Sequence, residues 1–282
     1  MTVAQKRRSV DEHIQVVAAL LGPTPVTRLP LIECAGLALA KPMIAAVSLP
    51  PFDNSSMDGY AVRASDIAQA SREQPVELPV PEDIPAGRTD SPTLEPGTAH
   101  RIMTGAPIPP GADAVVPVEL TDGGRHQVRI YASRTPGESV RPAGGDVVAG
   151  EEVLPAGAEL GSAQLGLAAA VGYAELPVRR RVRVLVLSTG SELVTPGTPL
   201  LYGQIYESNG TMLAAAVVEV GGVAELMHFV PDDVDELEAA LAPRLAGVDL
   251  LVTSGGVSAG AYEVVKAAMT GQGVEFGKVA MQ

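Results

Sequence analysis

Two strand-and-loop stretches in the last third of the chain decide the fold. The first reads Val182-Arg183-Val184-Leu185-Val186-Leu187 and continues into Ser188-Thr189-Gly190-Ser191-Glu192-Leu193; the second reads Val248-Asp249-Leu250-Leu251-Val252-Thr253 and continues into Ser254-Gly255-Gly256-Val257-Ser258-Ala259-Gly260. Both begin as nearly continuous apolar runs, typical of strands buried on both faces of a parallel sheet. Each loop is expected to open onto a helix. Small residues at the carboxyl ends of parallel strands let backbone amides approach a ligand, so a ligand site is predicted at that edge.

Strands and helices alternate around these stretches, from residue 179 onward. Ser208 and Asn209 are expected to cap a helix, 224–230 to form a strand, and Asp232 to cap the next helix. A helix at 261–269 and a strand at 274–280 follow the second loop. This order predicts right-handed crossovers and a mostly parallel sheet.

The earlier part of the chain has a different pattern of residues. Ser9-Val10-Asp11-Glu12 forms a capping box before a helix that Gly22-Pro23 ends, and a short helix is expected at 30–35. Between 38 and 146, short runs rich in Val and Ile alternate with Pro-Gly turns, which indicates a β-rich module. A strand at 151–154 and a helix capped by Ser162 come next.

These changes in residue pattern along the chain predict three domains. A discontinuous linker domain would combine residues 1–47 with 147–178, a β-rich domain at 48–146 would be inserted in it, and the α/β domain would occupy 179–282.

Composition excludes several classes of function. The 282 residues carry a net charge of −13 and only 3% aromatic side chains, which disfavours binding to a phosphate backbone or to stacked bases. No apolar run is long enough to span a bilayer, and Asp11 and Glu12 interrupt the N-terminal apolar run, which argues against a signal peptide. The only cysteine, Cys34, fits a reducing compartment. We therefore expect a cytoplasmic protein with no nucleic-acid or membrane partner.

Common catalytic signatures are also missing. The 4 histidines are scattered without the spacing of a zinc site. The sequence has no Walker A lysine and no Gly-x-Gly-x-x-Gly.

Five acids lie beside glycine-rich turns or helix starts: Asp58, Asp146, Glu192, Asp232 and Glu263. Carboxylates at a phosphate-binding edge commonly hold Mg²⁺. Each acid also has a structural explanation. Asp58-Gly59 is a turn dipeptide, Asp232 an N-cap, Glu192 an acid near a helix amino end, and the other two fit as surface acids.

In combination the motifs resemble one family. The segment Pro50-Pro51-Phe52-Asp53-Asn54-Ser55-Ser56-Met57-Asp58-Gly59-Tyr60-Ala61-Val62, the segment Arg101-Ile102-Met103-Thr104-Gly105-Ala106-Pro107 and the two glycine loops follow one another as in the MoeA-like molybdopterin molybdenumtransferases, which are related to the E domain of gephyrin. The resemblance implies a multidomain α/β plus β protein. It would have a molybdopterin-binding-like domain with helices on both faces of the sheet, the inserted β-rich domain, and an elongated linker domain that also serves dimerisation.

The resemblance also implies a reaction, in which molybdate is inserted into adenylylated molybdopterin with Mg²⁺-dependent release of AMP to form molybdenum cofactor. It assigns catalytic roles to Asp58, Thr104, Asp146 and Glu192, substrate contacts to Thr189, Gly190, Ser254, Gly255, Gly256, Ser258, Arg141 and Lys278, and metal contacts to Asp232, Glu263 and Glu192. The implied partners are adenylylated molybdopterin, molybdate, a second copy of the chain that shares the site, and the molybdopterin adenylyltransferase. In such a homodimer, Asp58 and Thr104 would face the glycine loops of the partner subunit.

Several positions depart from the family pattern. Ser191 stands where a second acid is frequent, Glu263 where Asp is common, and Pro142 and Ala143 where basic residues often follow Arg141. Gln282 stands where lysine is frequent. The family continues into a small C-terminal β-barrel domain, so the sequence is expected to be a truncated form with reduced or no activity of its own.

Two alternative functions remain open on sequence alone. One is a competence-damage-like amidase or pyrophosphatase, which shares the fold and a Thr-Gly-x-Glu-Leu loop but lacks the Met-Asp-Gly-Tyr block. The other is a non-catalytic molybdopterin-binding or scaffold role, as in the receptor clustering of gephyrin.

Overall fold

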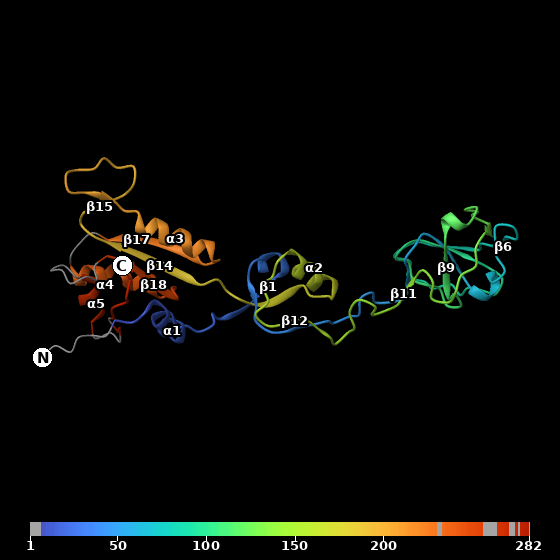
Figure 1. Cartoon of the computed structure of the whole chain (residues 1–282), viewed down its shortest axis with the longest axis horizontal. Helices are drawn as coiled ribbons and strands as arrows, with labels where there is room; N and C mark the ends of the chain where they lie inside the picture. Colours follow the sequence, from blue (N-terminus) through green and yellow to red (C-terminus); the bar gives the residue numbers. More distant parts are fainter. Residues whose placement is uncertain (1–6, 230–232, 256–263, 271–273, 276, 282) are drawn as a thin grey trace. The chain divides into compact units, whose positions relative to one another are not determined.

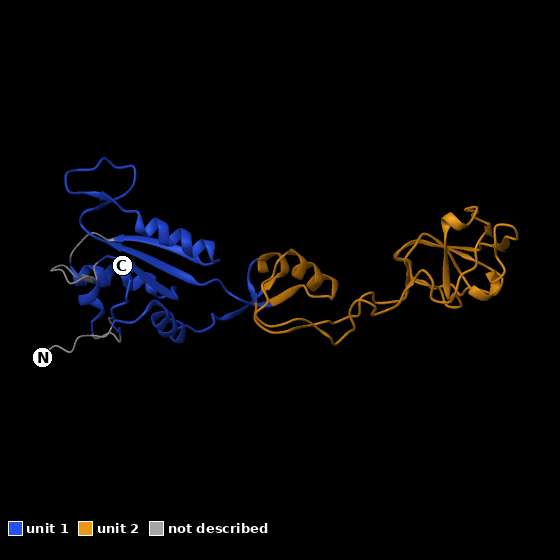
Figure 2. Ribbon diagram, in the orientation of Figure 1, with its two compact units in different colours: residues 1–28, 36–38, 177–282 blue, residues 29–35, 39–176 orange. Residues whose placement is uncertain are grey.

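A computed structural model describes residues 7–229, 233–255, 264–270, 274–275 and 277–281 (Figure 1). The chain divides into two compact units (Figure 2). Unit 1 comprises residues 1–28, 36–38 and 177–282, and unit 2 comprises residues 29–35 and 39–176. The division into three domains made from the sequence stays a prediction.

Unit 1 is built on a three-stranded parallel sheet. Its central strand β14 (Arg183–Thr189) lies between β17 (Val223–Phe229) and β18 (Leu250–Ser254). The register pairs Ser188 with His228 on one side and with Ser254 on the other. The carboxyl ends of all three strands therefore meet at one edge, as parallel pairing requires. The α/β character predicted from the sequence is confirmed.

Alternation along β14 places its side chains on two faces. Leu185 and Leu187 are fully buried and pack with residues of α4 (Val234–Leu245) and α5 (Val264–Met269). Ser188 points the other way, where Gly210 of α3 (Asn209–Glu219) approaches so closely that a Cβ atom there would lie 2.7 Å from the Ser188 hydroxyl.

The loop after β14 does not open onto a helix, contrary to the prediction. Leu193–Val194 forms a short strand β15, parallel to β16 (Ile205–Tyr206), and α3 begins only after β16. Pro196 and Pro199 explain the difference, because proline fixes φ and lacks the N–H that a helix started at residue 191 would need.

Two predicted helix caps, those of α2 (Ser162–Ala170) and α4, differ from the structure, and the cap predicted for α3 is right in position only. Gly161, not Ser162, is the N-cap of α2, and its start has no side-chain cap. Ser208 occupies the N-cap of α3 without a side-chain bond. Helix α4 is capped by Asp233, whose carboxylate accepts a hydrogen bond from the Glu236 N–H at 2.9 Å; its neighbour Asp232 lies outside the described residues.

Of three further predicted features, one is confirmed and two differ from the structure. The capping box is confirmed: Ser9 and Glu12 exchange hydrogen bonds at the start of α1 (Val10–Leu20). The helix expected at 30–35 is a 3₁₀ turn, η1 (Leu31–Cys34). The strand expected at 274–280 is wrong for the described part of that segment, where Val279 makes only an isolated bridge to Arg8. Gly277 weakens this segment as a strand because it offers no side chain to pack.

Unit 2 contains most of the remaining strands and is rich in turns. A four-stranded sheet has the order β7 (Glu82–Ile84), β8 (His100–Ile102), β5 (Gly59–Val62) and β9 (Ala114–Pro117). Two-stranded pairs are formed by β6 (Val76–Pro79) with β10 (Gln127–Ile130), β4 (Asn54–Ser55) with β11 (Val140–Arg141), and β3 (Met43–Ile44) with β12 (Glu152–Leu154). A further sheet has the order β1 (Val26–Pro30), β13 (Glu175–Arg179) and β2 (Ala38–Leu39).

The core of unit 2 lies around β5. Apart from Tyr60, the buried residues of its two clusters are aliphatic. Tyr60 and Val62 are fully buried in a cluster with Ile67 of the 3₁₀ turn η2 (Ala64–Ile67), while Ala61 faces a second cluster with Ile102 and Val115. Burial on both faces fixes β5 firmly, and with it the residues that immediately precede the strand.

Candidate functional site

Asp58 and Thr104 come together in unit 2. Asp58 ends the bend before β5, and Thr104 lies in the turn after β8. One carboxylate oxygen of Asp58 accepts hydrogen bonds from the backbone N–H and the hydroxyl of Thr104, both at 2.7 Å. The Thr104 N–H and then its hydroxyl lower the pKa of Asp58, and Arg101 adds to the effect. Asp58 is therefore an anion at neutral pH, with its second oxygen not engaged by Thr104.

The conformation of the Met-Asp-Gly-Tyr block has a local cause. A Cβ atom at Gly59 would lie 1.9 Å from the carbonyl oxygen of Val116, so only glycine fits beside β9. Tyr60 follows with its ring buried and its hydroxyl donating to the Gly124 carbonyl at 3.0 Å. These two residues fix the backbone that presents Asp58.

Arg141 and Asp146 belong to a segment held against the same stretch of chain. Arg141 pairs with Asn54 in the register of β11 and β4, and the Ala143 N–H donates to the Asp53 carboxylate at 2.7 Å. The Asp146 N–H donates to the Leu49 carbonyl at 2.9 Å. Both Arg141 and Asp146 are exposed. The segment that carries Arg141 and Asp146 is thus hydrogen-bonded to residues 49–54. Among the described residues, neither side chain makes a hydrogen bond or ion pair with Asp58.

The two glycine loops of unit 1 touch each other at the carboxyl edge of the sheet. Gly255 has φ +89°, and a Cβ atom there would lie 2.4 Å from the carbonyl oxygen of Thr189. Gly190 has φ +154°, and a Cβ atom there would lie 2.7 Å from the Glu192 carboxylate. Glycine is therefore required at Gly255 by close approach to backbone and by a positive φ, and at Gly190 by its positive φ. The structure brings together Thr189, Gly190, Ser254 and Gly255, as the sequence predicts.

Two acids lie at this edge without an ion pair among the described residues. Glu192 is exposed in the turn after Gly190. Glu207 is buried, and its Oε1 atom accepts hydrogen bonds from the Ser188 hydroxyl at 3.0 Å and from the Gly210 N–H at 2.5 Å. Thr189 is also buried, and its hydroxyl oxygen has no hydrogen-bond partner in the described structure.

Sequence reasoning missed Glu207 as a site residue. Its signal is an acid directly before Ser208-Asn209-Gly210, at the start of a helix, where a carboxylate can accept from the first free N–H groups. It also lines a cavity of about 200 Å³ at the carboxyl ends of β14 and β17, whose other lining residues are Ser188, Thr195, Pro196, Thr211, Leu226, Met227 and His228.

Four predicted site residues lie outside the described residues: Gly256, Ser258, Asp232 and Glu263. Lys278 is exposed, and its carbonyl oxygen accepts from the Arg8 N–H at 2.9 Å. In the part of the chain that the structure describes, no three His, Cys, Asp or Glu residues gather closely enough to hold a metal ion. Two of the three predicted metal ligands are not among those residues, so the metal contacts stay a prediction.

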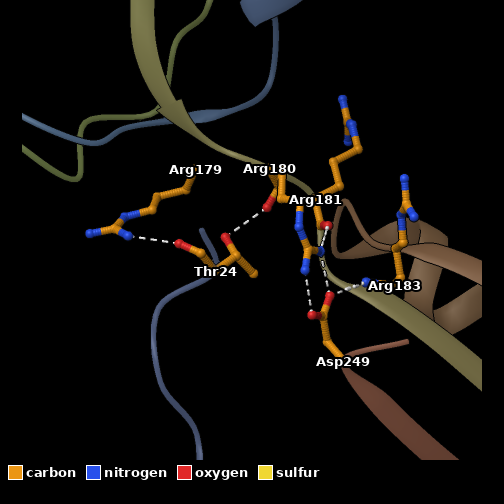
Figure 3. A network of polar contacts seen from close by, with 6 residues as sticks. All are labelled: Thr24, Arg179, Arg180, Arg181, Arg183 and Asp249. Atoms are coloured by element: carbon orange, nitrogen blue, oxygen red, sulfur yellow. Dashed lines mark hydrogen bonds and ion pairs between the residues drawn. The ribbon is translucent and has the colours of Figure 1, made fainter. Parts of the chain in front are cut away.

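The amino-terminal edge of the same sheet is organised differently (Figure 3). Arg180 forms a bidentate ion pair with Asp249, with both N···O distances 2.6 Å, and the Arg183 N–H also donates to this carboxylate, at 2.9 Å. Arg180, and then the Arg183 N–H, lower the pKa of Asp249 to about 2. Thr24 joins the network: its hydroxyl donates to the Arg180 carbonyl, and its own carbonyl accepts from Arg179. This network anchors the ends of β14 and β18.

None of the helices in the described part of the chain has the length and apolar character needed to cross a membrane.

Comparisons with known proteins agree with these features. The sequence profile of "MoeA N-terminal region (domain I and II)" matches residues 8–172, and that of a "Probable molybdopterin binding domain" matches residues 185–282. A Mycobacterium tuberculosis protein named molybdopterin molybdenumtransferase 2 is 56% identical over 98% of this chain and 70% of its own length. A molybdopterin molybdenumtransferase of Nostoc is 42% identical over 82% of this chain and 53% of its own length. The crystal structure of a molybdopterin biosynthesis MoeA protein from Pyrococcus horikoshii superposes with a TM-score of 0.78 at 34% identity, covering 93% of this chain and 67% of that one.

Proposed function

Because this chain belongs to the MoeA family, we propose that it acts as a molybdopterin molybdenumtransferase, an enzyme of molybdenum cofactor biosynthesis. The substrates would be adenylylated molybdopterin and molybdate, and the products molybdenum cofactor and AMP. The single observation that carries the proposal is the 56% identity to a protein of that name over 98% of the chain. The geometry supports it at two places.

The first place is the carboxyl edge of the parallel sheet. Parallel sheets bind ligands where their strands end, and there the backbones of Thr189, Gly190 and Gly255 come close enough to allow contact with a pterin or phosphate group. Ser254, Gly256 and Ser258 would extend this contact surface. The buried hydroxyl of Thr189, which has no partner among the described residues, is suited to a hydrogen bond with bound ligand.

The second place is the Asp58–Thr104 pair. Its carboxylate stays ionised at neutral pH and keeps one oxygen free of Thr104, as is required of a group that orients water or a substrate proton. Asp146 would act with it, and Arg141 and Lys278 would attract the anionic substrates from exposed positions.

Mg²⁺ fits the chemistry of the predicted donor set, which consists of carboxylate oxygens. Glu192 is exposed at the loop and has no recorded ion pair in the described structure, so it is available as a ligand; Asp232 and Glu263 would complete the set. When bound, the ion would offset negative charge on the phosphoanhydride.

The finer features of the assembly belong to the same proposal. Helices would cover both faces of the sheet, and two copies of the chain would form a homodimer. Asp58 and Thr104 of one subunit would then face the glycine loops of the other. The molybdopterin adenylyltransferase would deliver the substrate in the cytoplasm.

Release of AMP tests the proposal directly. The protein is incubated with adenylylated molybdopterin and Mg²⁺, with and without molybdate, and AMP and molybdenum cofactor are measured. We expect AMP release that depends on molybdate and matches cofactor formation. Binding of the substrate without any molybdate-dependent AMP would contradict the proposal and favour a non-catalytic binding role.

A further inference from the structure

We propose that Glu207 is a positioning residue: it holds the first glycine loop, 189–192, in the conformation that accepts substrate. The role in turnover rests on the function proposed above. The role in ordering the loop stands on the geometry alone and is tested separately.

The first argument is the unusual burial of a charge. Glu207 is 9% exposed and is the only carboxylate among the buried residues that the structure describes. Burying a carboxylate is costly unless hydrogen bonds or opposite charges compensate it. The Ser188 hydroxyl, the Gly210 N–H and the amino end of α3 supply that compensation, all through neutral groups. The position of Glu207 is therefore tightly specified.

The second argument is where these contacts lead. Ser188 directly precedes Thr189 and Gly190, so the hydrogen bond from its hydroxyl fixes the residue at which the loop departs from β14. The Glu207 N–H also donates to the Val194 carbonyl at 2.9 Å, just beyond the loop. One residue thus holds the chain on both sides of the loop.

The third argument is that neighbouring contacts reinforce the same attachment. The Ile205 N–H donates to the Glu192 carbonyl at 2.9 Å, so β16 holds the acid of the loop as well. A Cβ atom at Gly210 would lie 2.7 Å from the Ser188 hydroxyl and 3.0 Å from the nearer Glu207 oxygen. The amino end of α3 therefore lies directly against the Glu207–Ser188 pair, where any side chain larger than that of glycine would displace it.

A role restricted to capping α3 makes a different prediction. A cap influences the stability of its helix, and its loss raises fraying in the first turn of α3. A positioning role additionally requires that the loop 189–192 lose order while α3 stays formed.

The test compares four variants of the protein: Glu207→Ala, Glu207→Gln, Ser188→Ala and the control Glu219→Ala. Gln keeps an oxygen that can accept from both Ser188 and Gly210, although it has no charge. Glu219 lies exposed in the last turn of α3, so its removal deletes a carboxylate from the same helix without touching the loop. Amide hydrogen exchange is followed in peptides from the loop, from α3 and from the core of unit 2.

We expect Glu207→Ala to accelerate exchange in the loop by about 10-fold, Ser188→Ala by less, and Glu207→Gln and Glu219→Ala by no measurable amount. Exchange in the unit 2 core should be unchanged in all four. Unchanged loop exchange in folded Glu207→Ala, or acceleration confined to α3, would overturn the proposal. If Glu207→Ala does not fold, Ser188→Ala decides by the same criterion.

Turnover adds a second readout. Loss of loop order should raise the KM for adenylylated molybdopterin about 10-fold in Glu207→Ala, with rescue by Glu207→Gln. A Gln variant as impaired as the Ala variant would show that charge, and not positioning, is what matters. If the unsubstituted protein releases no AMP, the proposed function fails, whereas the exchange data still decide whether Glu207 orders the loop.

Discussion

The two edges of the parallel sheet in unit 1 treat their acids in opposite ways. At the amino edge, Asp249 is paired with Arg180, and Glu225 is paired with Arg244. At the carboxyl edge, Glu192 and Glu207 have no ion-pair partner in the described structure, and the Thr189 hydroxyl is buried without a hydrogen bond. The first edge is saturated by contacts within the chain. The polar groups of the second edge have no such partners among the described residues, and this difference is the reason for proposing the ligand site there.

The largest effect is expected from removing the unpaired charge of the loop. Glu192→Gln should lower molybdate-dependent AMP release by about 100-fold, because a metal-binding or catalytic carboxylate has no replacement nearby. Its stability should change by no more than about 0.5 kcal/mol, since the side chain is exposed. The matched control is Glu225→Gln at the other edge, which should keep full activity. Equal activity of Glu192→Gln and Glu225→Gln would contradict the proposal that only the carboxyl edge serves the reaction.

In unit 2, Asp58 is an acid that also keeps one carboxylate oxygen free of its partner, Thr104. Thr104→Val removes the hydroxyl that bonds to Asp58 and leaves the backbone N–H, so the pKa of Asp58 should rise partway toward its ordinary value. We expect AMP release to fall by about 10-fold. Thr98→Val is the control, because the Thr98 hydroxyl only donates to the Glu95 carbonyl in a surface turn. Carboxyl titration by NMR measures the pKa; an unchanged pKa together with unchanged activity would remove the pair from the mechanism.

At the amino edge the expected effect is on stability alone. Asp249→Ala removes a bidentate ion pair and a bond to the Arg183 N–H, and should lower the free energy of unfolding by about 1–2 kcal/mol, a modest value because the site is partly exposed. Activity per folded molecule should not change. Urea unfolding and AMP release are measured on the same preparation, and a loss of specific activity would show that this edge also serves the reaction.

The smallest effect is the pH dependence of the same ion pair. The pKa of Asp249 is lowered from 3.8 to about 2, so the folded state binds the proton less readily than the unfolded one. The stabilisation is therefore fully present above about pH 4 and is lost as the pH falls toward 2. The difference in stability between the unsubstituted protein and Asp249→Asn should shrink over that range. A difference that stays constant from pH 7 to pH 2 would contradict the lowered pKa.

Local rules predicted the three strands of the parallel sheet, the capping box and the paired loops from the sequence. Leu185 and Leu187 form a buried strand as their pattern requires, and Ser9 and Glu12 cap α1 reciprocally. The helix predicted after the first loop, with Glu192 near its amino end, is wrong because Pro196 and Pro199 follow too closely for a helix to form there.

The candidate site was predictable only in part, and the reason is distance along the chain. Asp58 and Thr104 could be named from their motifs, but their contact depends on β5 and β8 lying side by side. The place of Glu207 at a helix start is a local signal, but its hydrogen bond to Ser188 joins residues 19 positions apart, with β15 and β16 between them. No local pattern encodes such a contact.

One measurement tests most directly which edge binds the ligand. Amide hydrogen exchange is compared in the protein with and without adenylylated molybdopterin and Mg²⁺, in peptides from the two ends of β14 and β18. We predict slower exchange at Thr189–Leu193 and Thr253–Gly255, and no change at Arg179–Arg183 or Val248–Leu250. Protection at the Arg180–Asp249 edge, with none at the glycine loops, would contradict the assignment.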